Sequence, residues 1–126
     1  MNRKVVTTQT APVPVGPYSQ AVSNGTLVFT AGQVGLDPNT GKLVEGGVEA
    51  ETRQALTNLQ AVLAAAGTSL DKALKVTVFL TDMGQFAAMN RVYAGFFPAE
   101  PPARTCIGVA ALPLGAAVEI EAVVPV

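Results

Sequence analysis

The segment PARTCI, residues 102–107, places an arginine and a cysteine two positions apart. Side chains along a strand alternate between its faces, so a strand here puts Arg104, Cys106 and Gly108 on one face. A guanidinium is a planar fork of donors that binds a carboxylate or phosphate through two parallel hydrogen bonds. The segment therefore predicts a site for a small carboxylic acid. An ion pair at the surface or at a subunit contact is the alternative.

A second polar candidate is Asn90, which lies on the otherwise apolar stripe of a helix predicted over residues 85–97. Phe86 and Tyr93 fall on the same side of that helix. Two interpretations of Asn90 stay open: a buried amide satisfied by backbone groups, or a donor aimed at a pocket.

Two carboxylates, Glu119 and Glu121, share one face of a strand predicted over residues 117–124. Such pairs are usually solvated and not catalytic. Only 13% of the residues in this chain are charged, however, so two carboxylates on one strand face are worth considering as functional groups. Spacing alone does not show whether either carboxylate meets Arg104.

The elements that must position these residues follow from the hydrophobic pattern. Asn24-Gly25 between two apolar runs predicts a hairpin, apolar residues at spacings of three and four predict a helix that Gly67 ends, and alternation predicts later strands. The order is strands, helix, strand, helix, strands, so we expect one α+β domain over residues 1–126, a mixed sheet with two helices on one face. The expected strands cover residues 20–22, 27–30, 74–81, 103–110 and 117–124, and the expected helices cover 48–66 and 85–97.

Two segments are expected to be irregular. Residues 11–18 (APVPVGPY) predict a stiff, extended arm that is pinned to the domain. Residues 32–47 contain five glycines and a turn over 37–41, but Lys42 is followed by leucine where a phosphate loop needs serine or threonine.

Composition excludes several classes of function. The chain has no histidine, which removes histidine-based triads and histidine metal sites, and its single cysteine cannot form an internal disulfide. A net charge of -1 makes nucleic acid an unlikely partner, and no apolar run is long enough for a signal peptide or membrane span, so we expect a cytoplasmic protein. The low charge content also predicts a homo-oligomer that buries apolar surface.

Sequence blocks in order from about Ala11 to the C-terminus resemble the reactive intermediate deaminase family (RidA, also called YjgF). The blocks are VGPYSQA (15–21), TAGQ (30–33), TRQAL with Asn58 and Leu59 (52–59), VTVFL (76–80), and PARTC (102–106) followed by VEIEA (118–122). Individually some are short, but together and at this spacing they are specific.

This resemblance implies a chorismate-mutase-like fold assembled as a homotrimer, with a pocket at each subunit interface. It implies hydrolysis of enamines and imines, such as 2-aminoacrylate, 2-iminopropanoate and 2-iminobutanoate, to 2-oxo acids and ammonia, without cofactor or metal. By the same resemblance, Arg104 binds the substrate carboxylate and Glu119 is the pocket glutamate that activates water. The remaining implied pocket residues are Tyr18, Gly32, Asn90 and Cys106.

Other interpretations stay open. Cys106 is expected to line the pocket as a thiol and not to act as a nucleophile, and Tyr18 is either a pocket residue or an anchor for the arm. Ala31 and Gly108 replace a serine and a glutamate found in many relatives, which alters the pocket. Two alternative functions stay open: a non-catalytic module that binds 2-oxo acids, and a ribonuclease. The acidic composition argues against a ribonuclease.

Overall fold

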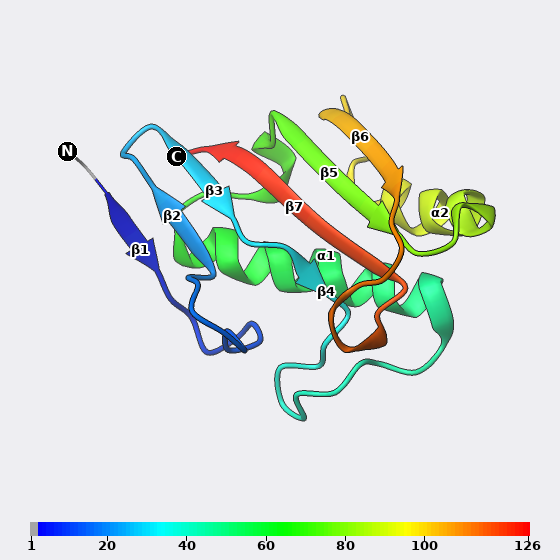
Figure 1. Cartoon of the computed structure of the whole chain (residues 1–126). Coiled ribbons are helices and arrows are strands. Elements are labelled where there is room, and N and C mark those ends of the chain that lie inside the picture. The colour runs from blue at the N-terminus through cyan, green and yellow to red at the C-terminus, as the bar shows by residue number, and fades with distance from the viewer. Residues whose placement is uncertain (1–2) are drawn as a thin grey trace.

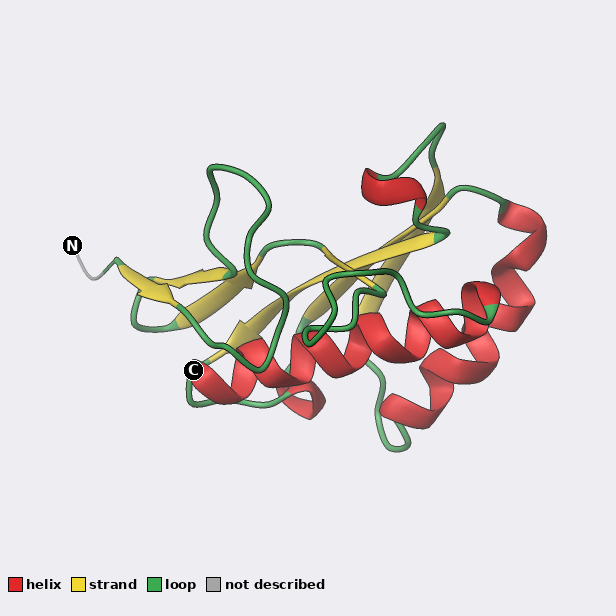
Figure 2. Ribbon diagram, turned by 90° about the horizontal axis from the view of Figure 1, so that it is seen from below, coloured by secondary structure: helices red, strands yellow, loops and turns green. Residues whose placement is uncertain are grey.

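A mixed β-sheet with two helices on one face forms the fold of residues 3–126, the part of the chain that this computed structural model describes (Figures 1 and 2). The helices are α1 (Gly47–Ala65) and α2 (Phe86–Phe96), and short 3-10 turns cover Leu70–Lys72, Met83–Gln85 and Pro113–Gly115. The strands are β1 (Lys4–Val6), β2 (Ala21–Ser23), β3 (Leu27–Thr30), β4 (Gln33–Val34), β5 (Lys75–Leu80), β6 (Ala103–Gly108) and β7 (Val118–Pro125).

The strands lie in the order β1-β2-β3-β7-β5-β6, and β4 pairs with another stretch of β7 (Figure 1). All neighbours are antiparallel except β5 and β6, which are parallel. A parallel pair needs a crossover connection, and α2 provides it. The predicted α+β class, with two helices on one face of a mixed sheet, is confirmed.

The core lies between α1 and the central strands. Leucines at Leu56, Leu59 and Leu63 are fully buried because they recur along one side of α1. They pack in one cluster with the alternate residues of β5 and β7 that face the helices. The helix ends at Ala65, one residue before the predicted end; Ala66 is its C-cap, and Gly67 follows with a φ of 83°.

Two short strands were not predicted, β1 and β4. The segment Gln33–Val34 is only two residues long, and Lys4–Val6 has a single buried side chain, so neither has an alternating pattern that a sequence could reveal. The strand expected over residues 103–110 is shorter than predicted and ends at Gly108.

Cross-strand register decides which side chains share a face of the sheet. Val78 lies beside Ile120 and Cys106, and these residues belong to the face that the helices cover. On the opposite face, which we call the open face, Phe79 lies beside Glu119 and Ile107. No helix within residues 3–126 has the length and apolar character needed to cross a bilayer.

Candidate active site

Arg104 is held firmly on the helix-covered side of edge strand β6. Its Nη1 donates a hydrogen bond of 2.7 Å to Oδ1 of Asn90 in α2. Its Cζ atom lies 4.7 Å from the ring centroid of Tyr93 and 5.4 Å from that of Phe86, both within the range of a cation–π interaction. The guanidinium is thereby oriented before any ligand arrives.

The charge of Arg104 lacks an anionic partner. Among residues 3–126, no carboxylate lies within 4.0 Å of the guanidinium, and the single ion pair of this region joins Arg91 to Glu49. The side chain borders a surface cavity of about 350 Å³ that it shares with Asn90 and Tyr93. An oriented, half-buried guanidinium at a cavity fits an incoming carboxylate.

The structure gives Asn90 a partner that the sequence did not reveal. Its amide oxygen accepts a hydrogen bond from Arg104 and not from a backbone N–H, while Asn90 also borders the cavity, so a donor role toward the cavity stays a prediction. Asn90 orients the guanidinium. The spacing of Phe86, Asn90 and Tyr93 along one side of α2 was visible in the sequence, but only the structure shows that all three converge on one cation.

Cys106 follows Arg104 on the same face and is half-buried. Burial raises the pKa of the Cys106 thiol, and the positive charge of Arg104 opposes that rise without cancelling it. The group is a protonated thiol at neutral pH, which favours the pocket-lining interpretation over a nucleophile.

Glu119 lies on the open face of β7, in close contact with Gly32. A Cβ atom at Gly32 would stand 2.7 Å from Cδ of Glu119 and 2.8 Å from its Oε2, so no larger residue fits without displacing the carboxylate. Burial raises the pKa of Glu119, and the neighbouring negative charge of Glu121 raises it further. A carboxylate with a raised pKa is better suited to accept a proton near neutral pH.

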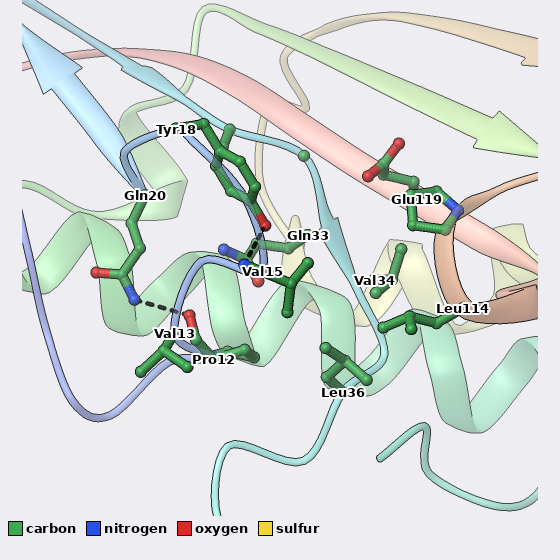
Figure 3. Close-up of a pocket in the computed structure, with 13 residues that line it drawn as sticks. Pro12, Val13, Val15, Tyr18, Gln20, Gln33, Val34, Leu36, Leu114 and Glu119 are labelled. Carbon is green, nitrogen blue, oxygen red and sulfur yellow. Dashed lines mark hydrogen bonds between the residues drawn. The ribbon is translucent and has the colours of Figure 1, made fainter. Parts of the chain in front are cut away.

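Tyr18 and the proline-rich arm form one wall of the cavity that contains Glu119 (Figure 3). The Tyr18 hydroxyl accepts a hydrogen bond of 3.2 Å from the backbone N–H of Val15. Buried Gln20 fixes the arm more strongly, because its amide donates to the carbonyls of Thr8 and Pro12 and accepts from the N–H of Thr8. The arm is pinned as predicted, and Tyr18 both anchors it and lines the cavity. Sequence reasoning missed Gln20.

The candidate residues fall into two groups on opposite faces of the sheet. Arg104 and Cys106 of β6 face α2, whereas Glu119 of β7 faces the other way beside Phe79 and Ile107. The first group is Arg104, Asn90 and Cys106, and the second is Tyr18, Gly32 and Glu119. A single chain does not bring the two groups into one pocket.

Comparison with known proteins shows the family to which this chain belongs. The profile described as Endoribonuclease L-PSP matches residues 8–126. The chain belongs to this family. It is the family of reactive intermediate deaminases that the sequence blocks resemble, so that expectation is confirmed.

Relatives within the Endoribonuclease L-PSP family are similar over nearly their whole length. The mouse (Mus musculus) protein named 2-iminobutanoate/2-iminopropanoate deaminase is 50% identical, over 96% of this chain and 90% of its own. The structure of E. coli TdcF with bound serine has a TM-score of 0.93 and 41% identity, covering 98% of each chain. RidA from the Antarctic bacterium Psychrobacter sp. PAMC 21119 has a TM-score of 0.94 and 42% identity, covering 98% of this chain and 99% of its own.

A metal site would require a cluster of metal-ligating side chains. Within residues 3–126, no three side chains of the histidine, cysteine, aspartate or glutamate type gather to form a metal site. What the two groups offer is an oriented guanidinium, a carboxylate with a raised pKa, and a cavity beside each.

Proposed function

We propose that this protein hydrolyses reactive enamine and imine intermediates, among them 2-aminoacrylate, 2-iminopropanoate and 2-iminobutanoate, to 2-oxo acids and ammonia. The observation that carries the proposal is the Arg104 guanidinium, which Asn90 and Tyr93 orient but no carboxylate neutralises. The name of the mouse relative, 2-iminobutanoate/2-iminopropanoate deaminase, supports the same reaction. So does the serine bound in the structure of E. coli TdcF, because serine presents a carboxylate beside an amino-bearing carbon.

The proposal includes a homotrimer in which neighbouring subunits complete each site. Because Arg104 and Glu119 lie on opposite faces of the sheet, both can act on one substrate only if Arg104 comes from one subunit and Glu119 from another. The open face carries apolar side chains suited to a subunit interface: Phe29 is 47% exposed and Ile107 is 42% exposed. The low charge content of the chain agrees with such burial.

Catalysis then begins with binding. Arg104 holds the substrate carboxylate through two parallel hydrogen bonds, and an enamine tautomerises to the imine without help from the protein. Glu119 of the neighbouring subunit orients a water molecule and accepts its proton as the oxygen attacks the imine carbon. The raised pKa of Glu119 makes its carboxylate a stronger proton acceptor than an ordinary glutamate.

The second half of the reaction returns the proton. Protonated Glu119 donates it to the nitrogen, which gives an adduct with a hydroxyl and an amino group on one carbon. Glu119 then takes the hydroxyl proton and passes it to the nitrogen as the C–N bond breaks, so that ammonia leaves and the carbonyl of the 2-oxo acid forms. Atoms balance, since imine and water give oxo acid and ammonia. General base catalysis contributes roughly 10²–10⁴-fold, and orientation of substrate and water adds to it. Cys106 lines the site as a thiol.

A coupled assay tests the proposal. A serine or threonine dehydratase generates the enamine in place, and the rate of 2-oxo acid formation is measured with and without this protein, after subtraction of the spontaneous rate. We expect clear acceleration by the wild type and none by Arg104→Ala. Absence of acceleration by the folded wild type would favour a module that binds 2-oxo acids without turnover.

The family description also raises ribonuclease activity. RNA binding relies on clustered cations, and this chain has 8 lysines and arginines against 9 acidic residues. We therefore favour deamination. RNA cleavage that survives the loss of Arg104 would indicate a contaminating nuclease.

A further inference from the structure

We propose that the preferred substrates carry a large apolar side chain, branched or aromatic, and that the cavity beside Glu119 encloses it. This inference rests on the proposed deaminase function and adds the class of imino acid that the site favours. The cavity, Glu119 and the arm are drawn in Figure 3.

The wall of this cavity is mainly hydrocarbon. Its polar side chains are few, and two of them are already engaged: the amide of Gln20 binds the arm, and the Tyr18 hydroxyl accepts from the Val15 N–H. Ala31 contributes a methyl group and no hydroxyl. The apolar residues that dominate the wall are Pro12, Val13, Val15, Val34, Leu36 and Leu114.

The size of the cavity exceeds what a small substrate needs. In the single subunit its volume is about 300 Å³. A methyl group, such as the side chain of 2-iminopropanoate, is close in size to a water molecule, whose share of liquid volume is about 30 Å³. Bound there, it would leave most of the apolar surface without contacts, whereas an isobutyl or benzyl group would bury much of it.

Leu114 provides a second, independent observation at the rim. Its backbone is in the left-handed region (φ 62°, ψ 19°), a conformation that is unfavourable for leucine and easy for glycine. Its side chain is 58% exposed, so burial in the core of this subunit does not compensate for that strain. In Figure 3 the Leu114 side chain extends toward Leu36 on the cavity wall. A large apolar side chain kept at a strained position beside Glu119 fits a role in contacting the substrate.

The position of the imine carbon beside Glu119 indicates which part of the substrate fills the cavity. Glu119 must lie next to the imine carbon to deliver water, and the substrate side chain is bonded to that same carbon. With the carboxylate held by Arg104 of the neighbouring subunit, the side chain is left to occupy the hollow around Glu119.

The test compares imines generated in place by an amino acid oxidase from alanine, leucine and phenylalanine. We expect kcat/KM to be at least about tenfold higher for 2-imino-4-methylpentanoate, the leucine product, than for 2-iminopropanoate, since a few methylenes in a fitted pocket give at least that discrimination. Equal or higher kcat/KM for 2-iminopropanoate would overturn this inference and leave the deaminase function standing. Hydrolysis of neither imine would instead refute the proposed function.

Two variants locate the preference in this cavity. Leu114→Gly relieves the backbone strain and removes the rim side chain, and Ala31→Ser adds a hydroxyl to the wall; each should lower the ratio of the two kcat/KM values severalfold. Leu74→Ala is the matched control, because Leu74 is a similarly exposed leucine (56%) outside the cavity and should leave the ratio unchanged. An unchanged ratio in both Leu114→Gly and Ala31→Ser would show that the side chain does not bind here.

Discussion

Replacement of Arg104 by lysine tests whether this residue binds the substrate through two parallel hydrogen bonds or through its positive charge alone. Lysine keeps the charge but cannot make two parallel hydrogen bonds to one carboxylate, and it cannot stack a planar group 4.7 Å from the Tyr93 ring while bonding to Asn90. Loss of a hydrogen bond to a charged group costs about 1.5–3 kcal/mol. At about 1.4 kcal/mol for each factor of ten, kcat/KM should fall roughly 10- to 150-fold.

The assay is the hydrolysis of freshly generated 2-iminobutanoate, corrected for the spontaneous rate. Stability should change little, because Arg104 is not fully buried and a cation–π contact of this kind contributes about 0.5–1 kcal/mol. The matched control is Arg91→Lys, an exposed arginine of α2 whose ion pair with Glu49 is 3.6 Å long, and it should retain wild-type kinetics. An Arg104→Lys protein as active as the wild type would refute the carboxylate-anchor role.

Further predictions concern the groups around Arg104 and Glu119. Asn90→Ala should raise KM by about tenfold through a less ordered Arg104, and measured KM and kcat for Asn90→Asp should show whether an oxygen acceptor rescues it. Glu119→Gln should lower turnover by about 10²-fold or more. Glu119→Gln should also raise the free energy of unfolding at neutral pH, because a raised pKa means that the ionised carboxylate destabilises the folded state. Denaturant titrations should show this difference between variant and wild type vanish as the pH falls below the unfolded-state pKa of about 4.3, where the carboxyl is protonated in both states. Glu121→Gln should leave turnover nearly intact while the acid limb of the pH–rate profile moves to lower pH, because it removes a charge that raises the pKa of Glu119.

Much of the fold could be predicted because periodicity reports burial directly. Alternation over residues 74–81 and spacings of three and four over residues 48–66 follow from one-sided packing of β5 and α1. The strands β1 and β4 escaped prediction because their pairing depends on neighbours distant in sequence, such as the stretch of β7 beside Gln33 and Val34.

The candidate site was harder to predict than the fold. Side-chain alternation correctly placed Arg104 with Cys106 on one face, and Glu119 with Glu121 on one face. Alternation could not show whether Arg104 and Glu119 lie on the same face of the sheet, because the relative register of their strands and the side that the helices cover depend on tertiary structure. The structure shows that Arg104 and Glu119 face opposite sides of the sheet, and that Asn90 accepts a hydrogen bond from Arg104.

Subunit complementation tests the central claim most directly, namely that one site uses Arg104 and Glu119 from different subunits. Arg104→Ala and Glu119→Gln are each expected to be nearly inactive, and they are unfolded together, refolded as a mixture and assayed for imine hydrolysis. Random assembly of equal amounts into a closed trimer restores about one quarter of the sites, so the mixture should recover up to about a quarter of wild-type activity. No recovery in mixed oligomers, verified by distinct tags on the two variants, would contradict the account.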